Sequence, residues 1–145
     1  MSAGKICSRV VATATPDEMV RAAALRMEEH DVGTLVVIEP KSQTAPVGIV
    51  TDRDIAVRCV AKGLNPDKTA VSKVMSKPVQ TVDEAMPIEE AIQQMARTST
   101  RRLVVTGTDN RLVGIVTLDD VLSLLTEEAA AISHLLEKQA PHIPA

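Results

Sequence analysis

The stretch GIVTDRDI, residues Gly48–Ile55, recurs 66 residues later as GIVTLDDV, residues Gly114–Val121. One matching stretch could arise by chance, but further matches precede both copies in the same order, at an offset of 68 residues. Ordered self-similarity of this kind indicates a unit that is present twice. The offset changes between Ile38 and Val47, which predicts that the second copy has an exposed loop two residues shorter. The preceding matches are Leu35–Val37 with Leu103–Val105, and Val11–Ala14 with Val79–Val82.

Each unit is predicted to run strand, helix, strand, strand, helix. In the first unit we expect a strand over Val10–Thr13 and then a helix capped by Thr15, with Glu18 closing a capping box. This helix is broadly apolar over Met19–Met27, which predicts deep burial. In the second unit Asp83 is the expected cap. The helix after it shows one apolar face at helical spacing, made of Ile88, Ala91, Ile92, Met95 and Ala96.

Two β-rich runs follow each of these helices, and the second run leads directly into another helix near Thr51 or Thr117. The segment Gly107–Arg111 is expected to be a hairpin loop, and Val71–Met75 a short helical lead-in to the second unit. The last helix is expected from about Leu118 to Glu137, with an apolar stripe that packs on the pair or on a partner. The β-rich runs are Thr34–Ile38, Val47–Val50, Arg102–Thr106 and Leu112–Val116.

A three-stranded sheet with helices on one side cannot bury its other surface alone, whereas two copies facing each other can. The predicted fold is therefore α/β, with two units packed as a pseudo-two-fold pair and clefts where they meet. We place the first unit at residues 6–64 and the second at 79–126. Residues 65–78 form a linker with the lead-in helix, and 127–145 a helix extension with a frayed tail over Pro141–Ala145.

Composition limits the classes of function. A net charge of -3 without a basic block disfavours nucleic-acid binding. The N-terminus lacks the apolar core of a signal peptide and no apolar run is long enough to cross a bilayer, so we expect a cytoplasmic protein that does not enter the membrane. Because the chain has no Phe, Tyr or Trp, a bound base would be held by aliphatic side chains and backbone groups.

Nothing in the sequence favours an enzyme or a metal site. Cys7 and Cys59 are far apart, and the three histidines have no metal-ligand spacing. There is no Walker-type loop and no grouping of a nucleophile with a histidine and an acid. The histidines are His30, His134 and His142.

The repeated Thr-x-x-Asp motif, Thr51 to Asp54 and Thr117 to Asp120, has two competing interpretations. The first is helix capping by the Thr and the Asp. The second is a nucleotide site, because a helix N-terminus presents free N–H groups to phosphate and a carboxylate can accept two hydrogen bonds from a ribose diol. Arg53 lies inside the first motif, where it could supply positive charge for a phosphate. The second motif has no such residue, so Arg101 and Arg102 would either supply the charge there or simply form part of a solvated surface.

Both units, roughly Ile6 to Leu125, resemble a tandem pair of cystathionine β-synthase (CBS) domains, also called a Bateman module, of the small bacterial stand-alone type. The resemblance rests on the Gly-apolar-apolar-Thr-x-x-Asp motif, on apolar-x-Thr at the end of the first strand, and on Val74–Val79. The family often has Pro where this chain has Val36 and Val104, which does not affect the fold.

The resemblance implies a ligand-binding role for the Thr and the Asp of each motif. Asp54 and Asp120 would hold ribose, and Thr51 and Thr117 would approach phosphate. Residues at the end of the first strand and the start of the second would line the adenine pocket, partly through backbone groups. These are Thr13 and Thr81, with Gly33, Thr34 and Leu35 in one unit and Arg101, Arg102 and Leu103 in the other.

The sequence thus predicts a non-enzymatic, regulatory sensor that binds AMP, ATP or NAD between the units and signals to a separate effector protein. The Arg53 motif is expected to favour the more highly charged ligand. The alternative is a scaffold that forms homodimers without a ligand, which the apolar stripe on the last helix favours.

Overall fold

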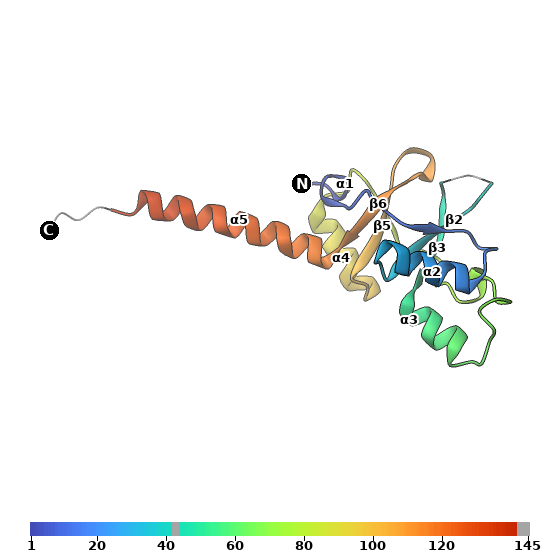
Figure 1. The fold of residues 1–145 in the computed structure, drawn as a ribbon. Coiled ribbons are helices and arrows are strands. Elements are labelled where there is room, and N and C mark those ends of the chain that lie inside the picture. The colour runs from blue at the N-terminus through green and yellow to red at the C-terminus, as the bar shows by residue number, and fades with distance from the viewer. Residues whose placement is uncertain (42–43, 142–145) are drawn as a thin grey trace.

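The fold is that of a computed structural model, which describes residues 1–41 and 44–141. These residues form two three-stranded sheets with helices packed against them (Figure 1). The strand order is β1-β2-β3 in one sheet and β4-β5-β6 in the other. In both, the first strand is parallel to the second and the second is antiparallel to the third. The predicted α/β fold with a duplicated unit is confirmed.

The first unit contains the predicted hairpin and two helices. Its elements are β1 (Thr13–Ala14), α2 (Val20–His30), β2 (Thr34–Ile38), β3 (Pro46–Thr51), α3 (Asp52–Ile55) and the π-helical turn η1 (Ala56–Val60).

The second unit repeats this order after the predicted lead-in turn. The pairing of Thr34 with Thr51 corresponds to that of Arg102 with Thr117, and both hairpins contain an irregularity four residues along the central strand. A short helix, α1 (Ala3–Ile6), precedes both units. The elements of the second unit are η2 (Val71–Lys73), β4 (Thr81–Asp83), α4 (Ile88–Thr98), β5 (Arg102–Thr106), η3 (Thr108–Asn110), β6 (Leu112–Thr117) and α5 (Leu118–Gln139).

Each hydrophobic core includes side chains from a segment that precedes the other unit. Val71 and Val74 of the lead-in turn are fully buried in the first core, together with Leu35. Ala3 of α1 is fully buried in the second core, together with Leu103. The two units are therefore tied together by exchanged segments, and the boundaries 6–64 and 79–126 stay a prediction.

The glycine that opens each copy of the GIVT stretch allows these exchanged segments to pass close to the third strand. Ser8 and Ile115 exchange backbone hydrogen bonds of 2.8 and 3.0 Å, and Ser76 and Ile49 exchange bonds of 2.7 and 3.1 Å. A Cβ at Gly114 would meet the Ser8 carbonyl oxygen at 2.3 Å. The repeat therefore requires glycine here for close approach.

Both predicted caps of the first helices are wrong. Glu18 accepts a 2.9 Å hydrogen bond from the Thr15 amide, but this contact closes a turn, and α2 begins only at Val20. Asp83 lies in β4, and α4 begins after Pro87. The reason is the same in both units: the residue before the helix, Met19 or Pro87, is extended and forms a bridge with the exchanged segment, at Ala70 or Ser2.

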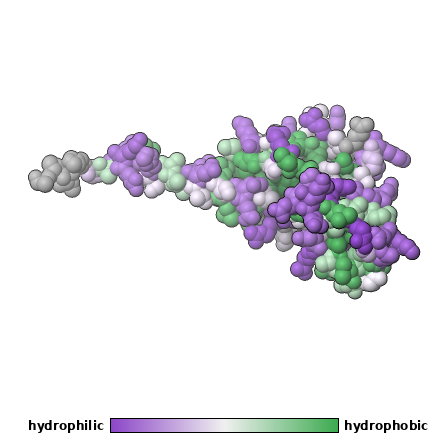
Figure 2. Space-filling view, viewed as in Figure 1, coloured by the Kyte–Doolittle hydropathy of each residue, from purple (hydrophilic) through white to green (hydrophobic). Residues whose placement is uncertain are grey.

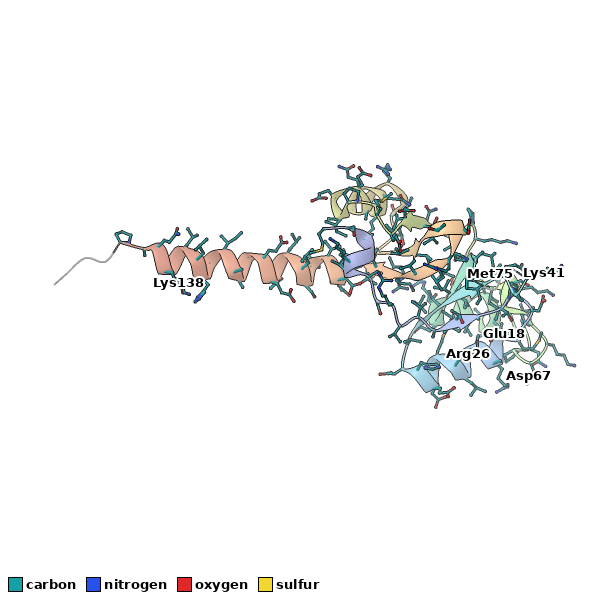
Figure 3. The ribbon with its side chains drawn as sticks, turned by 90° about the horizontal axis from the view of Figure 1, so that it is seen from above. Glu18, Arg26, Lys41, Asp67, Met75 and Lys138 are labelled. Carbon is teal, nitrogen blue, oxygen red and sulfur yellow. The ribbon has the colours of Figure 1, made fainter. Side chains whose placement is uncertain are left out.

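The first strand and the burial of the first helix also differ from expectation. β1 covers Thr13–Ala14 rather than Val10–Thr13. α2 is not buried more deeply than α4, because each helix buries three side chains and Leu25 of α2 is 57% exposed. Arg26 of α2 instead pairs with Glu18 at 2.6 Å at the edge of the first unit (Figure 3).

α5 extends well beyond the sheets, so that its distal half, which carries Lys138, projects from the rest of the molecule (Figures 1 and 3). Apolar side chains lie along it between polar ones (Figure 2). None of the described helices is both long and apolar enough to cross a bilayer. Residues 142–145 of the expected frayed tail lie outside the described residues.

Candidate functional site

The two Thr-x-x-Asp motifs form complete capping boxes at the N-termini of α3 and α5. Thr51 Oγ1 accepts from the Asp54 amide at 3.1 Å, and Asp54 Oδ2 accepts from the Thr51 amide at 2.9 Å. Thr117 and Asp120 form the same two bonds at the same distances. Capping occupies Oδ2 of each carboxylate and leaves Oδ1 available, so capping and ligand binding are compatible.

A cavity of about 410 Å³, here called the Asp54 cavity, lies between the first motif and the second unit. Ile49, Thr51 and Asp54 line one side of it, and the start of β5 lines the other. The chain between the units completes the wall. The chain between the units supplies Ser76, Pro78, Val79 and Gln80, and the region at the start of β5 supplies Ser99, Thr100, Arg101 and Arg102.

A second cavity of about 300 Å³, here called the Asp120 cavity, has the same construction with the units exchanged. Ile115, Thr117 and Asp120 line it, opposite the start of β2. Nearly every lining position corresponds to one in the Asp54 cavity at the repeat offset. The remaining residues are Ser8, Val10, Val11, Ala12, Val32, Gly33, Thr34 and Arg102.

Arg102 is the residue that lines both cavities. Its Nη1 donates to Thr34 Oγ1 at 2.7 Å. Arg102 and Thr34 occupy the same position of the repeat, the first residue of the central strand, so their contact lies at the pseudo-two-fold axis. The two cavities are therefore neighbours separated by this pair.

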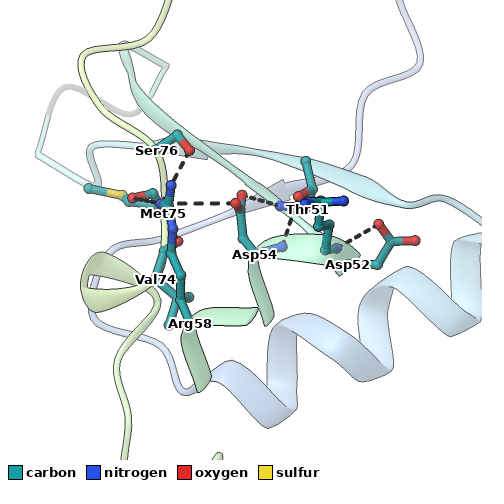
Figure 4. A network of polar contacts seen from close by, with 8 residues as sticks. Thr51, Asp52, Asp54, Arg58, Val74, Met75 and Ser76 are labelled. Atoms are coloured by element: carbon teal, nitrogen blue, oxygen red, sulfur yellow. Dashed lines mark hydrogen bonds and ion pairs between the residues drawn. The ribbon is translucent and has the colours of Figure 1, made fainter. Parts of the chain in front are cut away.

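Arg58 forms an ion pair with the carboxylate of the Asp54 cavity (Figure 4). Its Nη1 donates to the carbonyl oxygens of Val74 and Met75 at 3.0 and 3.1 Å and lies 3.9 Å from Asp54 Oδ1. The guanidinium thus joins the second helix of unit one to the chain between the units. The equivalent residue at the repeat offset is Leu124, which cannot make these contacts.

The basic residues are distributed differently from the expectation. Arg101, which was assigned to the second motif, lines the Asp54 cavity, although its side chain is 74% exposed and also lies 3.8 Å from Asp119. Arg53 is exposed and lines neither cavity. The Asp54 cavity therefore has two lining arginines, and the Asp120 cavity has only the shared Arg102.

Four other predicted residues lie outside both cavities. Leu35 and Leu103 are fully buried in the cores. The Thr13 carbonyl accepts from Arg26, and the Thr81 carbonyl accepts from Gln94 at the equivalent position. These two hydrogen bonds, to Thr13 and Thr81, hold the first strand of each sheet against the first helix of its unit. Gly33, Thr34, Arg101 and Arg102 do line a cavity, as do both Thr and both Asp of the repeated motif.

Segments 8–12 and 76–80, which lead into the first strand of each unit, also line the cavities. They supply aliphatic walls, through Pro78 and Val79 in one cavity and Val10 and Val11 in the other. The resemblance placed Val11 and Val79 there with the end of the first strand, whereas Val10 and Pro78 were not predicted.

The remaining candidates for chemistry are structural. Cys7 packs against the second core, and burial raises the pKa of its thiol above the ordinary value. Cys59 is fully buried in the first core. No three His, Cys, Asp or Glu side chains within residues 1–41 and 44–141 come together as a group able to hold a metal ion.

Known proteins share both the sequence pattern and this architecture. The family model of the CBS domain matches residues 3–60 and 71–127. The CBS domain-containing protein YhcV of Bacillus subtilis is 40% identical over 121 residues, which cover 83% of each chain.

Two solved structures are similar over most of this chain. The CBS domain protein PAE2072 of Pyrobaculum aerophilum, complexed with AMP, gives a TM-score of 0.76 at 25% identity, covering 90% of this chain and 99% of its own. A hexameric CBS-CP12 protein from bloom-forming cyanobacteria gives 0.73 at 30% identity, covering 84% and 66%. With two family matches and one duplicated fold, the chain belongs to the CBS-domain family.

Proposed function

We propose that this protein is a non-enzymatic regulatory module that binds an adenine nucleotide, AMP, ATP or NAD, in each of the two cavities. The observation that carries this proposal is the pair of equivalent cavities, each with a capped helix N-terminus and an acidic side chain facing the other unit. The complex of the similar Pyrobaculum aerophilum protein with AMP supports this ligand class.

Each part of a nucleotide has a matching group in the cavity. The Asp54 or Asp120 carboxylate accepts from the ribose hydroxyls through the oxygen that the capping box leaves available. The Thr hydroxyl and the helix N-terminus lie beside the phosphate. Because the chain has no Phe, Tyr or Trp, the adenine is held between aliphatic side chains such as Ile49, Pro78 and Val79.

The two cavities differ in the charge they offer. Arg101 and Arg102 line the Asp54 cavity, whereas Arg102 alone lines the Asp120 cavity. Additional positive charge favours additional phosphate. The Asp54 cavity is therefore the site for the more highly charged ligand, and Arg101 rather than Arg53 supplies the additional charge.

Ultraviolet absorption and calorimetry test this function. The protein has no Trp or Tyr, so absorption in the adenine band of the purified protein reports bound nucleotide directly. Released ligand is identified by mass spectrometry, and AMP, ATP and NAD are titrated into the stripped protein. Binding at two sites supports the proposal. A protein that purifies free of nucleotide and shows no heat with any of the three contradicts it.

We also propose that the chain forms a homodimer through α5. Leu122, Leu125, Ile132 and Leu136 are each about half or more exposed, at 49%, 51%, 59% and 64%. With Ala129 they are spaced by three and four residues, the spacing of a coiled-coil seam.

A ligand-driven change in the packing of the units would pass through such a dimer to a separate effector protein. A scaffold that needs no ligand is the second candidate function.

A further inference from the structure

Arg102 is a cation between two sites for anions. Its side chain is half-buried, and its one hydrogen-bonding partner among the described side chains is the uncharged Thr34 hydroxyl. Within residues 1–41 and 44–141, no carboxylate lies within ion-pair distance of its guanidinium. A partly desolvated charge without a counterion is unfavourable, so the guanidinium is available to an acidic group of a ligand.

The repeat makes this position unique. If the two units were identical, each cavity would have its own arginine at the start of the central strand. The first unit has Thr34 there instead, so one guanidinium lines both cavities. The second arginine, Arg101, lines the Asp54 cavity only, and the Asp120 cavity has Gly33 at the equivalent position of the repeat.

We propose that Arg102 couples the two cavities, because its guanidinium serves the phosphate of a ligand in only one of them at a time. This inference rests on the proposed nucleotide-binding function. A phosphate that enters the second cavity meets a positive charge that is already neutralised. Binding of an anionic nucleotide in either cavity therefore weakens binding of a second one in the other.

The coupling has two properties that follow from its origin. It is reciprocal, so occupation of either cavity lowers the affinity of the other by the same factor, which we expect to be about tenfold. It also depends on the ligand's charge. Adenosine has the base and the ribose of AMP but no phosphate, so two adenosine molecules should bind without this penalty.

Calorimetric titrations of the full chain with AMP and adenosine test the coupling. Asp54→Asn and Asp120→Asn weaken one cavity each and give the affinity of the other by itself. In the wild type, the second AMP should bind about tenfold more weakly than these isolated affinities predict, whereas adenosine should follow them.

Arg102→Gln should weaken AMP in both isolated cavities and remove the penalty. The matched control is Arg101→Gln, which should weaken AMP only in the Asp54 cavity and keep the penalty. Arg102→Lys, which retains the charge, should also keep it, and this variant tests the proposal if Arg102→Gln does not fold.

Two results would overturn the coupling alone: two AMP molecules that bind the wild type as the isolated cavities predict, or an effect of Arg102→Gln confined to one cavity. If neither AMP nor adenosine binds the wild type, the proposed function fails together with the coupling.

Discussion

Gly114 lies so close to Ser8 that a Cβ atom would be 2.3 Å from the Ser8 carbonyl oxygen and 2.8 Å from the Cys7 sulfur. Ser8 is held there by two backbone hydrogen bonds to Ile115, so it cannot move aside without breaking them. Gly114→Ala should therefore destabilise the protein by about 3 kcal/mol. Urea unfolding followed by circular dichroism measures this change.

The equivalent glycine in the first unit provides the comparison. A Cβ at Gly48 would meet the flexible end of Met75 at 2.8 Å and the Ser76 carbonyl oxygen at 3.0 Å. Because a Met side chain can adjust, Gly48→Ala should cost less, about 1 to 2 kcal/mol. Equal losses for the two variants would show that close passage of the exchanged segment is not what requires glycine.

Arg58 should matter for one cavity and not for the other. Arg58→Met removes the hydrogen bonds to the carbonyl oxygens of Val74 and Met75 and the ion pair with Asp54. The Arg58 side chain is 45% exposed, so we expect a loss of only about 1 kcal/mol in stability. Nucleotide affinity should fall at the Asp54 cavity, because its carboxylate and one wall lose their support.

Calorimetry in the Asp54→Asn and Asp120→Asn backgrounds assigns the effect of Arg58→Met to a cavity. Leu124→Met, at the equivalent position of the second unit, is the matched control and should leave both affinities unchanged. A fall at the Asp120 cavity would contradict the prediction.

The capping and binding roles of Asp120 can be separated by two substitutions. Asp120→Asn keeps an oxygen that accepts from the Thr117 amide, whereas Asp120→Ala does not. The Ala variant should lose about 1 kcal/mol of stability and the Asn variant much less. Both should lose nucleotide affinity at the Asp120 cavity by about tenfold or more, because ribose hydrogen-bonds to a charged acceptor. Thermal unfolding and calorimetry give the two quantities, and affinity that follows stability would show a capping role only.

The sequence predicted the elements whose signals are local. The apolar runs and the Thr-x-x-Asp motifs give the hairpins and the starts of α3 and α5, since the strands and the capping boxes depend on neighbouring residues. The predicted starts of α2 and α4 were wrong because contacts with residues far along the chain determine where these helices begin. Met19 is held extended by Ala70, and Pro87 by Ser2, so a capping sequence four residues earlier only forms a turn.

The candidate site shows the same division. The Thr and Asp of each motif line the cavities as the motif predicts, because neighbouring residues in the capping box set their positions. Arg101 lines the cavity of the first motif rather than the second, because each cavity takes its opposite wall from the other unit. That pairing depends on how the two units face each other, which the spacing of residues within one unit does not determine.

The exposed seam of α5 leads to a prediction about assembly. A helix of this length has few contacts with the sheets beyond its first turns, and an isolated helical segment of about 12 residues is marginally stable in water. Pairing of Ile132 and Leu136 with the same seam of a second chain would bury them and stabilise the distal half. Ile132→Glu combined with Leu136→Glu should therefore convert a dimer to a monomer and reduce helix content.

Light scattering coupled to size-exclusion chromatography measures the mass, and circular dichroism measures the helix content. The matched control combines Ala130→Glu with His134→Glu, which adds the same charge at the same spacing in the same part of α5 but outside the seam, and should leave the dimer intact. Because Ile132 and Leu136 lie in the distal half of α5, away from both cavities, the variant should still bind AMP. A wild-type monomer, or a dimer that survives both glutamates, would contradict the α5 interface without affecting the nucleotide sites.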